Sequence, residues 1–253
     1  MRKKTVLTVL LTALIFISAC VLTVTTVYRV SAVTLEIQAI SEEAKTEAET
    51  LEKSIAAHYK GKNIFSADSA VARLKFEEYP HFRMTSFKKA YPNRLIVTAS
   101  EDAEVYAVES ENGYRILGAS GVVLCDRETP KNRSDGHDNV IIKGVLAAGQ
   151  RGSVPTDEYF LLTIAFCEAF DTQSDGIRNN VVSVTLEKPT SNDDYAYLRL
   201  KFREGAEAIV YSPLSKTQEK AKSLYSYYAS VSTEKRMSGV IYVSEEGKCH
   251  YEP

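Results

Sequence analysis

Residues 61–101, GKNIFSADSAVARLKFEEYPHFRMTSFKKAYPNRLIVTASE, contain the signals that decide the fold of the first half of the chain. Ser66 is placed to cap the N-terminus of a helix, and Pro80 is placed to end it. The apolar positions between them recur at helical spacing and predict one buried face: Ala67, Ala70, Val71 and Leu74. The stretch therefore opens with a short amphipathic helix.

Two strands are predicted after this helix. Residues 82–91 form the first, and Pro92-Asn93 supplies the turn. Beyond the turn, Leu95, Val97 and Ala99 alternate with more polar positions, which is the period-two pattern of a strand with one buried face. The helix is thus followed by a β-hairpin.

A strand and a second helix are predicted upstream. Residues 34–40 alternate as a short strand, Ser41 caps a helix, and Gly61 fits the position just past the C-terminal end of that helix. The inward positions of the helix are Ala44, Ala48, Leu51, Ile55 and His58/Tyr59. The order over residues 34–102 is β-α-α-β-β, a plausible size for one small domain.

This order and several local motifs resemble the POTRA domain of the bacterial cell-division family FtsQ/DivIB. The motif Gly61-Lys62-Asn63-Ile64-Phe65 precedes the second helix, and Tyr91-Pro92-Asn93 forms the hairpin turn. Lys89 before the turn and the alternating Leu95, Val97, Ala99 and Glu101 after it complete the likeness. The resemblance implies a POTRA domain at residues 34–102.

The N-terminus predicts a membrane anchor. Residues 5–28 carry no charge and are long enough to cross a bilayer. The basic residues Arg2, Lys3 and Lys4 precede them, which favours a cytoplasmic tail at residues 1–4 and an external position for the rest. We therefore predict a single-pass type II protein of the cell membrane.

A cleaved signal peptide and a lipoprotein signal are the alternatives to this anchor. A signal peptide has a shorter apolar core than this run. Ile17-Ser18-Ala19-Cys20 fits a lipoprotein signal, but residues 21–27 remain apolar after Cys20, where a mature lipoprotein would turn polar. The retained helix is the preferred interpretation, and lipidation of Cys20 stays open.

The composition argues against two other classes of protein. The net charge of −2 gives no basic footprint for nucleic acid. Cys125, Cys167 and Cys249 are isolated and odd in number, so they predict separate, partly buried thiols. One disulfide among them is the alternative in an oxidising compartment.

The second half of the chain, residues 103–253, predicts a mostly antiparallel β domain with flanking helices. Turns are expected at Asn112-Gly113 and residues 189–194, with a polar loop at 126–138. The predicted strands are residues 103–109, 114–117, 122–125, 140–144, 181–186, 195–202, 207–211, 240–244 and 248–251.

Two helices are predicted among these strands. The first covers residues 155–170, with Phe160, Leu161, Ile164, Ala165 and Glu168 at helical spacing. The second runs to about residue 229 from a capping box of Ser215 and Gln218, with Ala221, Leu224, Tyr225 and Tyr228 inward.

This half also resembles the β domain of FtsQ/DivIB proteins. The likeness rests on Gly121-Val122-Val123, on Ile142-Lys143-Gly144 and on the late order of strand, strand, Lys-rich helix and strand. It implies a non-catalytic scaffold of the division septum that binds FtsB/DivIC and FtsL and helps to regulate septal peptidoglycan synthesis.

The sequence offers little for catalysis, metals or cofactors. Ser86 and Lys89, and likewise Ser232 and Lys235, match Ser-x-x-Lys, but this short motif arises readily by chance. The four histidines are scattered without ligand spacing: His58, His81, His137 and His250. We expect neither an enzyme nor a cofactor; a wall-active serine enzyme and a lipid-anchored, chaperone-like POTRA module are the alternatives.

The last strand is the predicted binding site. A terminal strand can expose unpaired backbone groups that accept a partner strand. The resemblance assigns FtsB/DivIC binding to Ser244, Lys248, Cys249, His250 and Tyr251. Tyr227 is predicted to point outward as a further contact, and Lys88 and Lys89 form a candidate surface for another membrane protein.

Overall fold

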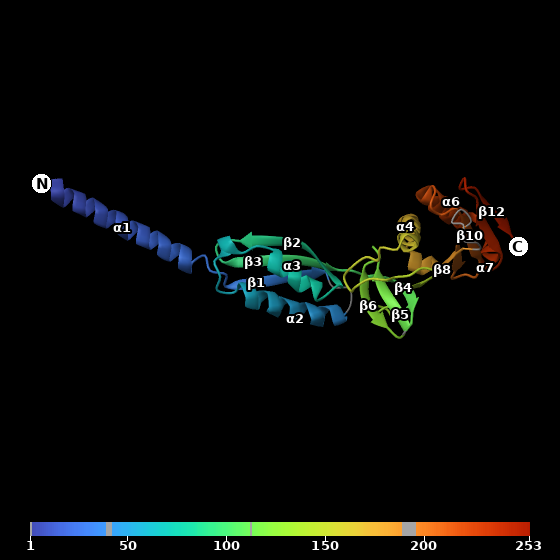
Figure 1. Cartoon of the computed structure of the whole chain (residues 1–253), viewed down its shortest axis with the longest axis horizontal. Coiled ribbons are helices and arrows are strands. Elements are labelled where there is room, and N and C mark those ends of the chain that lie inside the picture. The colour runs from blue at the N-terminus through green and yellow to red at the C-terminus, as the bar shows by residue number, and fades with distance from the viewer. Residues whose placement is uncertain (1, 39–41, 112, 189–195) are drawn as a thin grey trace. The chain divides into compact units, whose positions relative to one another are not determined.

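The computed structural model describes residues 2–38, 42–111, 113–188 and 196–253. The chain divides into two compact units, Met1–Glu101 and Asp102–Pro253, each with its own hydrophobic core. The fold is α+β with mixed sheets (Figure 1). The predicted cap at Ser41, the end of the first strand at Ile40, the turn residue Asn112 and the turn at residues 189–194 lie outside the described residues.

Helix α1 (Arg2–Thr26) contains a segment, Leu7–Thr26, that is long and apolar enough to cross a membrane. Its hydroxyl groups donate hydrogen bonds to carbonyls one turn earlier, as Thr12 does to Thr8 (2.9 Å) and Ser18 to Leu14 (2.8 Å). Polar groups satisfied within the helix are compatible with a lipid environment. The expectation of one N-terminal apolar helix of spanning length is confirmed.

The N-terminal unit continues with β1 (Ala32–Gln38), α2 (Glu42–Tyr59), the 3₁₀ turn η1 (Ile64–Ser66), α3 (Ala70–Glu77), β2 (Phe82–Ala90) and β3 (Arg94–Glu101). The sheet order is β1-β3-β2; β3 pairs in parallel with β1 and antiparallel with β2. Helix α2 runs alongside this sheet (Figure 1). The predicted alternation is confirmed, because Leu95, Val97 and Ala99 are all buried in the core.

Helix α3 begins later than predicted, so the expected buried face is partly wrong. The Asn63 side chain accepts a hydrogen bond from Phe65 N (2.9 Å) and starts the 3₁₀ turn that occupies Ser66. The helix then begins at Ala70 and turns Ala72 and Phe76 inward. Val71 is half-buried, whereas Leu74, expected inside, is exposed.

The C-terminal unit is built on one nine-stranded sheet, in the order β12-β11-β10-β9-β8-β7-β4-β5-β6. Its strands are β4 (Glu104–Ser110), β5 (Gly113–Gly118), β6 (Val123–Arg127), β7 (Val140–Lys143), β8 (Val181–Glu187), β9 (Tyr197–Phe202), β10 (Glu207–Tyr211), β11 (Val240–Val243) and β12 (Cys249–Glu252). Of the eight neighbouring pairs, five are antiparallel and three are parallel. The sheet is therefore mixed. Each parallel pair requires a long crossover connection between its two strands.

Helices occupy two of these crossovers. Helices α4 (Glu158–Gln173) and α5 (Ile177–Asn180) lie between β7 and β8 in the chain, and α6 (Thr217–Ser230) and α7 (Thr233–Met237) lie between β10 and β11. Parallel neighbours require such long connections, whereas antiparallel neighbours can be joined by a short turn. The last two strands form the predicted hairpin, β11–β12.

The positions of α4 that recur at helical spacing are only partly buried. Phe160 and Ile164 are buried as expected, but Leu161, Ala165 and Glu168 are exposed. The remaining buried positions are Leu162, Thr163, Phe166, Cys167, Ala169 and Phe170. The helix packs against α6 as well as β8, so its buried surface is broader than a single stripe and centred elsewhere.

The capping box predicted for α6 does not form. Ser215 donates to the Ser212 carbonyl (3.2 Å), and the ammonium of Lys220 donates to the same hydroxyl (3.1 Å). Lys220 is fully buried and also donates to the carbonyls of Tyr211 (2.8 Å) and Ser212 (2.7 Å). Burial lowers the pKa of Lys220. The turn after β10 is thus held by a buried cation, not by a side-chain cap.

Candidate partner-binding site

Strand β12 is an edge of the nine-stranded sheet, with β11 as its neighbour there. Ser244 N donates to the Lys248 carbonyl (3.0 Å) at the hairpin turn. Hydrogen-bonded and non-hydrogen-bonded pairs alternate along an antiparallel ladder. Ser244 and Lys248 form a hydrogen-bonded pair, so the pair two residues further along, Tyr242 and His250, is also hydrogen-bonded, and the backbone of His250 faces β11. The backbone N–H and C=O groups of Cys249 and Tyr251 then point away from the sheet. This row is the template that a partner strand would extend.

The side chains of Cys249 and Tyr251 pack against the core of the unit. Tyr251 also donates its hydroxyl hydrogen to the Ser238 carbonyl (3.1 Å), and the Lys235 ammonium lies 5.1 Å from its ring centroid. These contacts fix the edge strand by its side chains. Its outward backbone groups are left available to a partner.

The opposite face of the same strands carries a row of aromatic rings. His250 stacks on Tyr242 with ring centroids 5.0 Å apart, and Tyr242 stacks on Tyr211 at 6.4 Å. Tyr197 continues the row, 6.0 Å from Tyr211. We call these four residues the aromatic row. Flat, partly exposed rings give contact area with little loss of side-chain entropy, which is typical of protein interfaces.

An ion-pair group adjoins the aromatic row. Arg199 donates to Glu187 (2.6 Å) and to Glu207 (2.9 Å), and Tyr197 donates to Glu187 as well. The hydrogen bond from Arg199 lowers the pKa of Glu187, and the hydrogen bond to Glu187 raises the pKa of Tyr197. The lowered pKa keeps Glu187 ionised at neutral pH, so the ion-pair group places fixed charge beside the rings.

The structure brings the predicted residues of the last hairpin together in β12 and the turn before it. Ser244 accepts from Lys248 N (3.1 Å) inside the turn, and the Lys248 side chain is exposed. Tyr227 lies on α6, half-buried against the core instead of pointing freely outward. Lys88 and Lys89 belong to β2 of the N-terminal unit and are described with it.

Sequence reasoning missed the aromatic row. Tyr197, Tyr211 and Tyr242 lie in segments that were predicted as strands, and the alternation within each strand gives each ring a face. The three tyrosines come together because β9, β10 and β11 are neighbours in the sheet. This arrangement depends on the parallel pairing of β10 with β11, in which Ile209 lies opposite Tyr242. No local pattern signals that pairing.

The two Ser-x-x-Lys motifs lie on β2 and at the start of α7. Ser86 lies on β2 and donates to the Thr98 hydroxyl (3.0 Å), while the Lys89 ammonium donates to the Phe65 carbonyl (2.8 Å). Residues three apart on a strand point to opposite faces, so Ser86 and Lys89 do not converge. Ser232 occupies the N-cap of α7.

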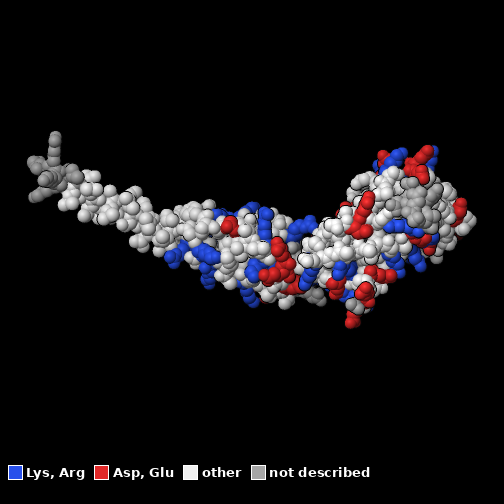
Figure 2. Space-filling model, viewed as in Figure 1, with Lys and Arg blue, Asp and Glu red and all other residues white. Residues whose placement is uncertain are grey.

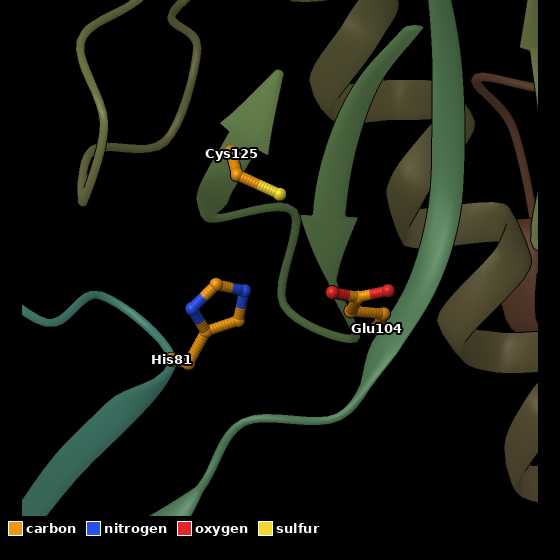
Figure 3. Close-up of side chains that lie close together, drawn as sticks. All are labelled: His81, Glu104 and Cys125. Atoms are coloured by element: carbon orange, nitrogen blue, oxygen red, sulfur yellow. The ribbon is translucent and has the colours of Figure 1, made fainter. Parts of the chain in front are cut away.

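Figure 3 labels three side chains of metal-ligating type, and each is described with its own unit. His81 is buried in the N-terminal unit, just before β2. Glu104 on β4 and Cys125 on β6 belong to the C-terminal unit. Both oxygens of the buried Glu104 carboxylate accept hydrogen bonds from Arg127, at 2.7 and 2.8 Å. Within the C-terminal unit, Glu104 therefore serves as the partner of an arginine.

Cys249 should react slowly with alkylating reagents because burial raises its pKa to about 11. Only the thiolate is nucleophilic, and each unit of pKa above the ambient pH lowers the thiolate fraction about tenfold. At pH 8, Cys249 of the folded chain should be alkylated by iodoacetamide about 100-fold more slowly than in urea, measured by peptide mass spectrometry. Equal rates in the two states would show that the edge strand is not packed as described.

Neither the family models nor the curated proteins with which the sequence was compared contain a match.

Proposed function

We propose that this chain is a non-catalytic scaffold of the bacterial division septum, of the FtsQ/DivIB type. Residues 34–102 would be its POTRA domain and residues 103–253 its β domain. The element order of the N-terminal unit (strand, two helices, two strands) supports the first assignment. The second is supported by the late order of strand, strand, helices and terminal hairpin.

The observation that carries the proposal is the unpaired edge of β12. Its side chains are anchored to the core through Cys249 and Tyr251, while its outward backbone groups run along the margin of a large sheet. A rigid edge of this kind binds an extended segment by β-augmentation, with main-chain hydrogen bonds for affinity and neighbouring side chains for specificity. The aromatic row, which begins at His250 on β12, supplies such neighbours.

In this proposal the partner is an FtsB/DivIC-type protein that brings FtsL with it, and the assembly helps to regulate septal peptidoglycan synthesis. Helix α1 would hold the scaffold in the cell membrane as a type II protein, with both units outside the cytoplasm and concentrated at the septum. Partners anchored in the same membrane meet the edge at a high effective concentration, so modest intrinsic affinity is sufficient.

The first test compares binding by the full chain in lipid nanodiscs with binding by a chain that ends at Gly247. The probe is the external segment of the FtsB/DivIC-type protein of the same organism, labelled for fluorescence anisotropy. The native chain should bind and the truncated chain should not. If the native chain does not bind, the scaffold proposal is wrong.

A matched pair of substitutions separates edge pairing from loss of folding. Cys249→Pro removes one outward N–H that the ladder with β11 does not use, whereas Cys249→Val keeps this donor and a side chain of similar volume. We expect Cys249→Pro to weaken binding at least about tenfold, the effect of about 1.4 kcal/mol, and Cys249→Val to leave it nearly unchanged. Circular dichroism verifies that both variants remain folded. Equal affinities of the two folded variants would contradict pairing at this edge.

A further inference from the structure

Three chain segments meet where α1 joins the rest of the N-terminal unit: residues 27–31, 58–66 and 88–94. Val30 N donates to the Lys62 carbonyl (2.9 Å), and Gly61 N donates back to Val30 (2.8 Å). Ser31 N donates to the Asn93 carbonyl (2.8 Å), which brings in the third segment. We call the surface of these three segments the juxtamembrane patch.

The juxtamembrane patch is held close to the end of α1. The helix ends at Thr26, and Tyr28, two residues later, already accepts a hydrogen bond from Ile64 N (2.8 Å). The Asn63 amide also donates to the Val24 carbonyl in the last turn of the helix (3.3 Å). A connection of two or three residues reaches about 10 Å at most. If α1 spans a bilayer, the patch must therefore lie at the level of the lipid headgroups.

The patch exposes an aromatic cluster. The ring of Phe65 lies 4.9 Å from that of Tyr28 and 5.5 Å from that of Tyr91. Phe65 is 52% exposed and Tyr91 is 56% exposed. Tyrosine and tryptophan rings gather at the membrane–water interface, where their apolar ring and their polar group are both accommodated. Phenylalanine inserts into the apolar side of the same boundary. The cluster has the composition and the position of such an interfacial belt.

The patch is also strongly basic, although the chain as a whole has a net charge of −2. Its three segments contain six Lys or Arg residues and no Asp or Glu: Arg29, Lys60, Lys62, Lys88, Lys89 and Arg94. Lys89 donates to the Phe65 carbonyl, and the other five side chains are exposed. Figure 2 shows Lys and Arg where the C-terminal end of α1 meets the rest of the unit. Anionic lipid headgroups attract Lys and Arg side chains that lie within a Debye length of the membrane surface.

We propose that the juxtamembrane patch docks on the acidic phospholipid headgroups of the membrane that α1 spans. Phe65 and Tyr91 would enter the interface, and the surrounding cations would pair with lipid phosphates. The inference rests on the membrane anchor of the proposed function, and it is independent of the partner bound at β12. Its consequence is that lipid composition controls how firmly the N-terminal unit is seated on the membrane.

The chain contains no tryptophan, so single substitutions provide specific fluorescence reporters. The full chain is placed in nanodiscs of zwitterionic lipid, with or without acidic phospholipid, and brominated acyl chains serve as the quencher. Phe65→Trp reports the patch, Phe16→Trp reports the middle of α1, and Leu74→Trp reports an exposed position on α3. We expect quenching of Phe65→Trp that rises at least twofold with acidic lipid, strong quenching of Phe16→Trp in both lipids, and little quenching of Leu74→Trp.

A charge test then separates lipid binding from mere proximity to the anchor. Three patch cations are replaced in the Phe65→Trp chain, as Lys60→Gln, Lys62→Gln and Arg94→Gln. The matched control makes the same charge change at exposed positions elsewhere in the unit: Lys45→Gln, Lys53→Gln and Arg73→Gln. Only the patch variant should lose the response to acidic lipid.

Two outcomes overturn this proposal without touching the binding edge. Quenching of Phe65→Trp that is the same in both lipids, or that the patch variant retains, shows that acidic headgroups are not bound. An unquenched Phe16→Trp shows that α1 is not inserted, which removes the anchor on which the docking rests. Partner binding at β12 is measured separately, so its failure is distinguishable from either result.

Discussion

Replacing Glu104 with glutamine should lower the free energy of unfolding of the C-terminal unit by about 3 kcal/mol. The Glu104 side chain is 1% exposed, and its two oxygens accept paired hydrogen bonds from Arg127 at 2.7 and 2.8 Å. Arg133 N adds a third hydrogen bond (3.0 Å). Glutamine keeps the shape but leaves the guanidinium without its counter-charge. The loss stays at the lower end of the range for broken buried pairs because Arg127 is 27% exposed and reaches water.

The matched control for this substitution is Glu109→Gln, on the same strand. Glu109 pairs with Lys143 at 2.7 Å, and both side chains are close to half exposed. Exposed ion pairs contribute about 0–1 kcal/mol, so the control should be nearly silent. Urea denaturation of the full chain in detergent, followed by near-ultraviolet circular dichroism, measures both variants. Similar losses in the two variants would mean that the Glu104–Arg127 pair does not hold the unit together.

The Glu104 cluster also shows what the sequence could not predict. Residues 126–138 are polar and predict a loop, and their composition gives no sign of a buried partner. In the structure Asn132, from the middle of that segment, donates to the Glu104 carbonyl (2.6 Å) and to Asn139 (2.9 Å). These contacts span up to 28 residues of sequence. Local periodicity cannot report them, because they depend on strand order.

The periodicity of apolar residues predicted the buried positions correctly where a helix or strand packs one face against the core. Helix α2 buries Leu51, Ile55 and Tyr59, and β3 buries Leu95 and Val97, all at the expected positions. The predicted start of α3 is too early because Ser66, although a good capping residue, lies in the preceding 3₁₀ turn. A propensity identifies residues that can cap a helix, but the neighbouring turn decides which of them does.

The candidate site was predictable only in its last strand. The terminal hairpin and its turn follow from residues 240–251 alone, and the structure confirms the hairpin. The assignment of Ser244 and Cys249 to partner binding came from the family resemblance and stays a prediction. The aromatic row needs β9, β10 and β11 to lie side by side, and the parallel pair β10–β11 is made through α6 and α7. The hairpin at the sheet edge can thus be predicted from a short stretch of sequence. The aromatic row beside it depends on the order of the strands in the sheet.

The largest expected loss of stability comes from Phe170→Ala on α4. Phe170 is fully buried, with its ring centroid 5.6 Å from Tyr225 and 6.2 Å from Phe202. Its neighbours come from α6 and from β9, so the ring joins the second helical crossover to the sheet. Truncating a buried phenylalanine removes its transfer free energy and leaves a cavity, which together cost about 3–5 kcal/mol.

Leu161→Ala is the matched control, because the helical spacing of the sequence and the structure disagree about the burial of this residue. Helical spacing groups Leu161 with Phe160 and Ile164, which are buried, whereas the structure leaves Leu161 45% exposed. Leu161→Ala should change the free energy of unfolding by about 0.5 kcal/mol or less, against several kcal/mol for Phe170→Ala. Urea titrations of both variants decide between the two. A larger loss for Leu161→Ala would mean that α4 is rotated about its axis relative to α6 and β8.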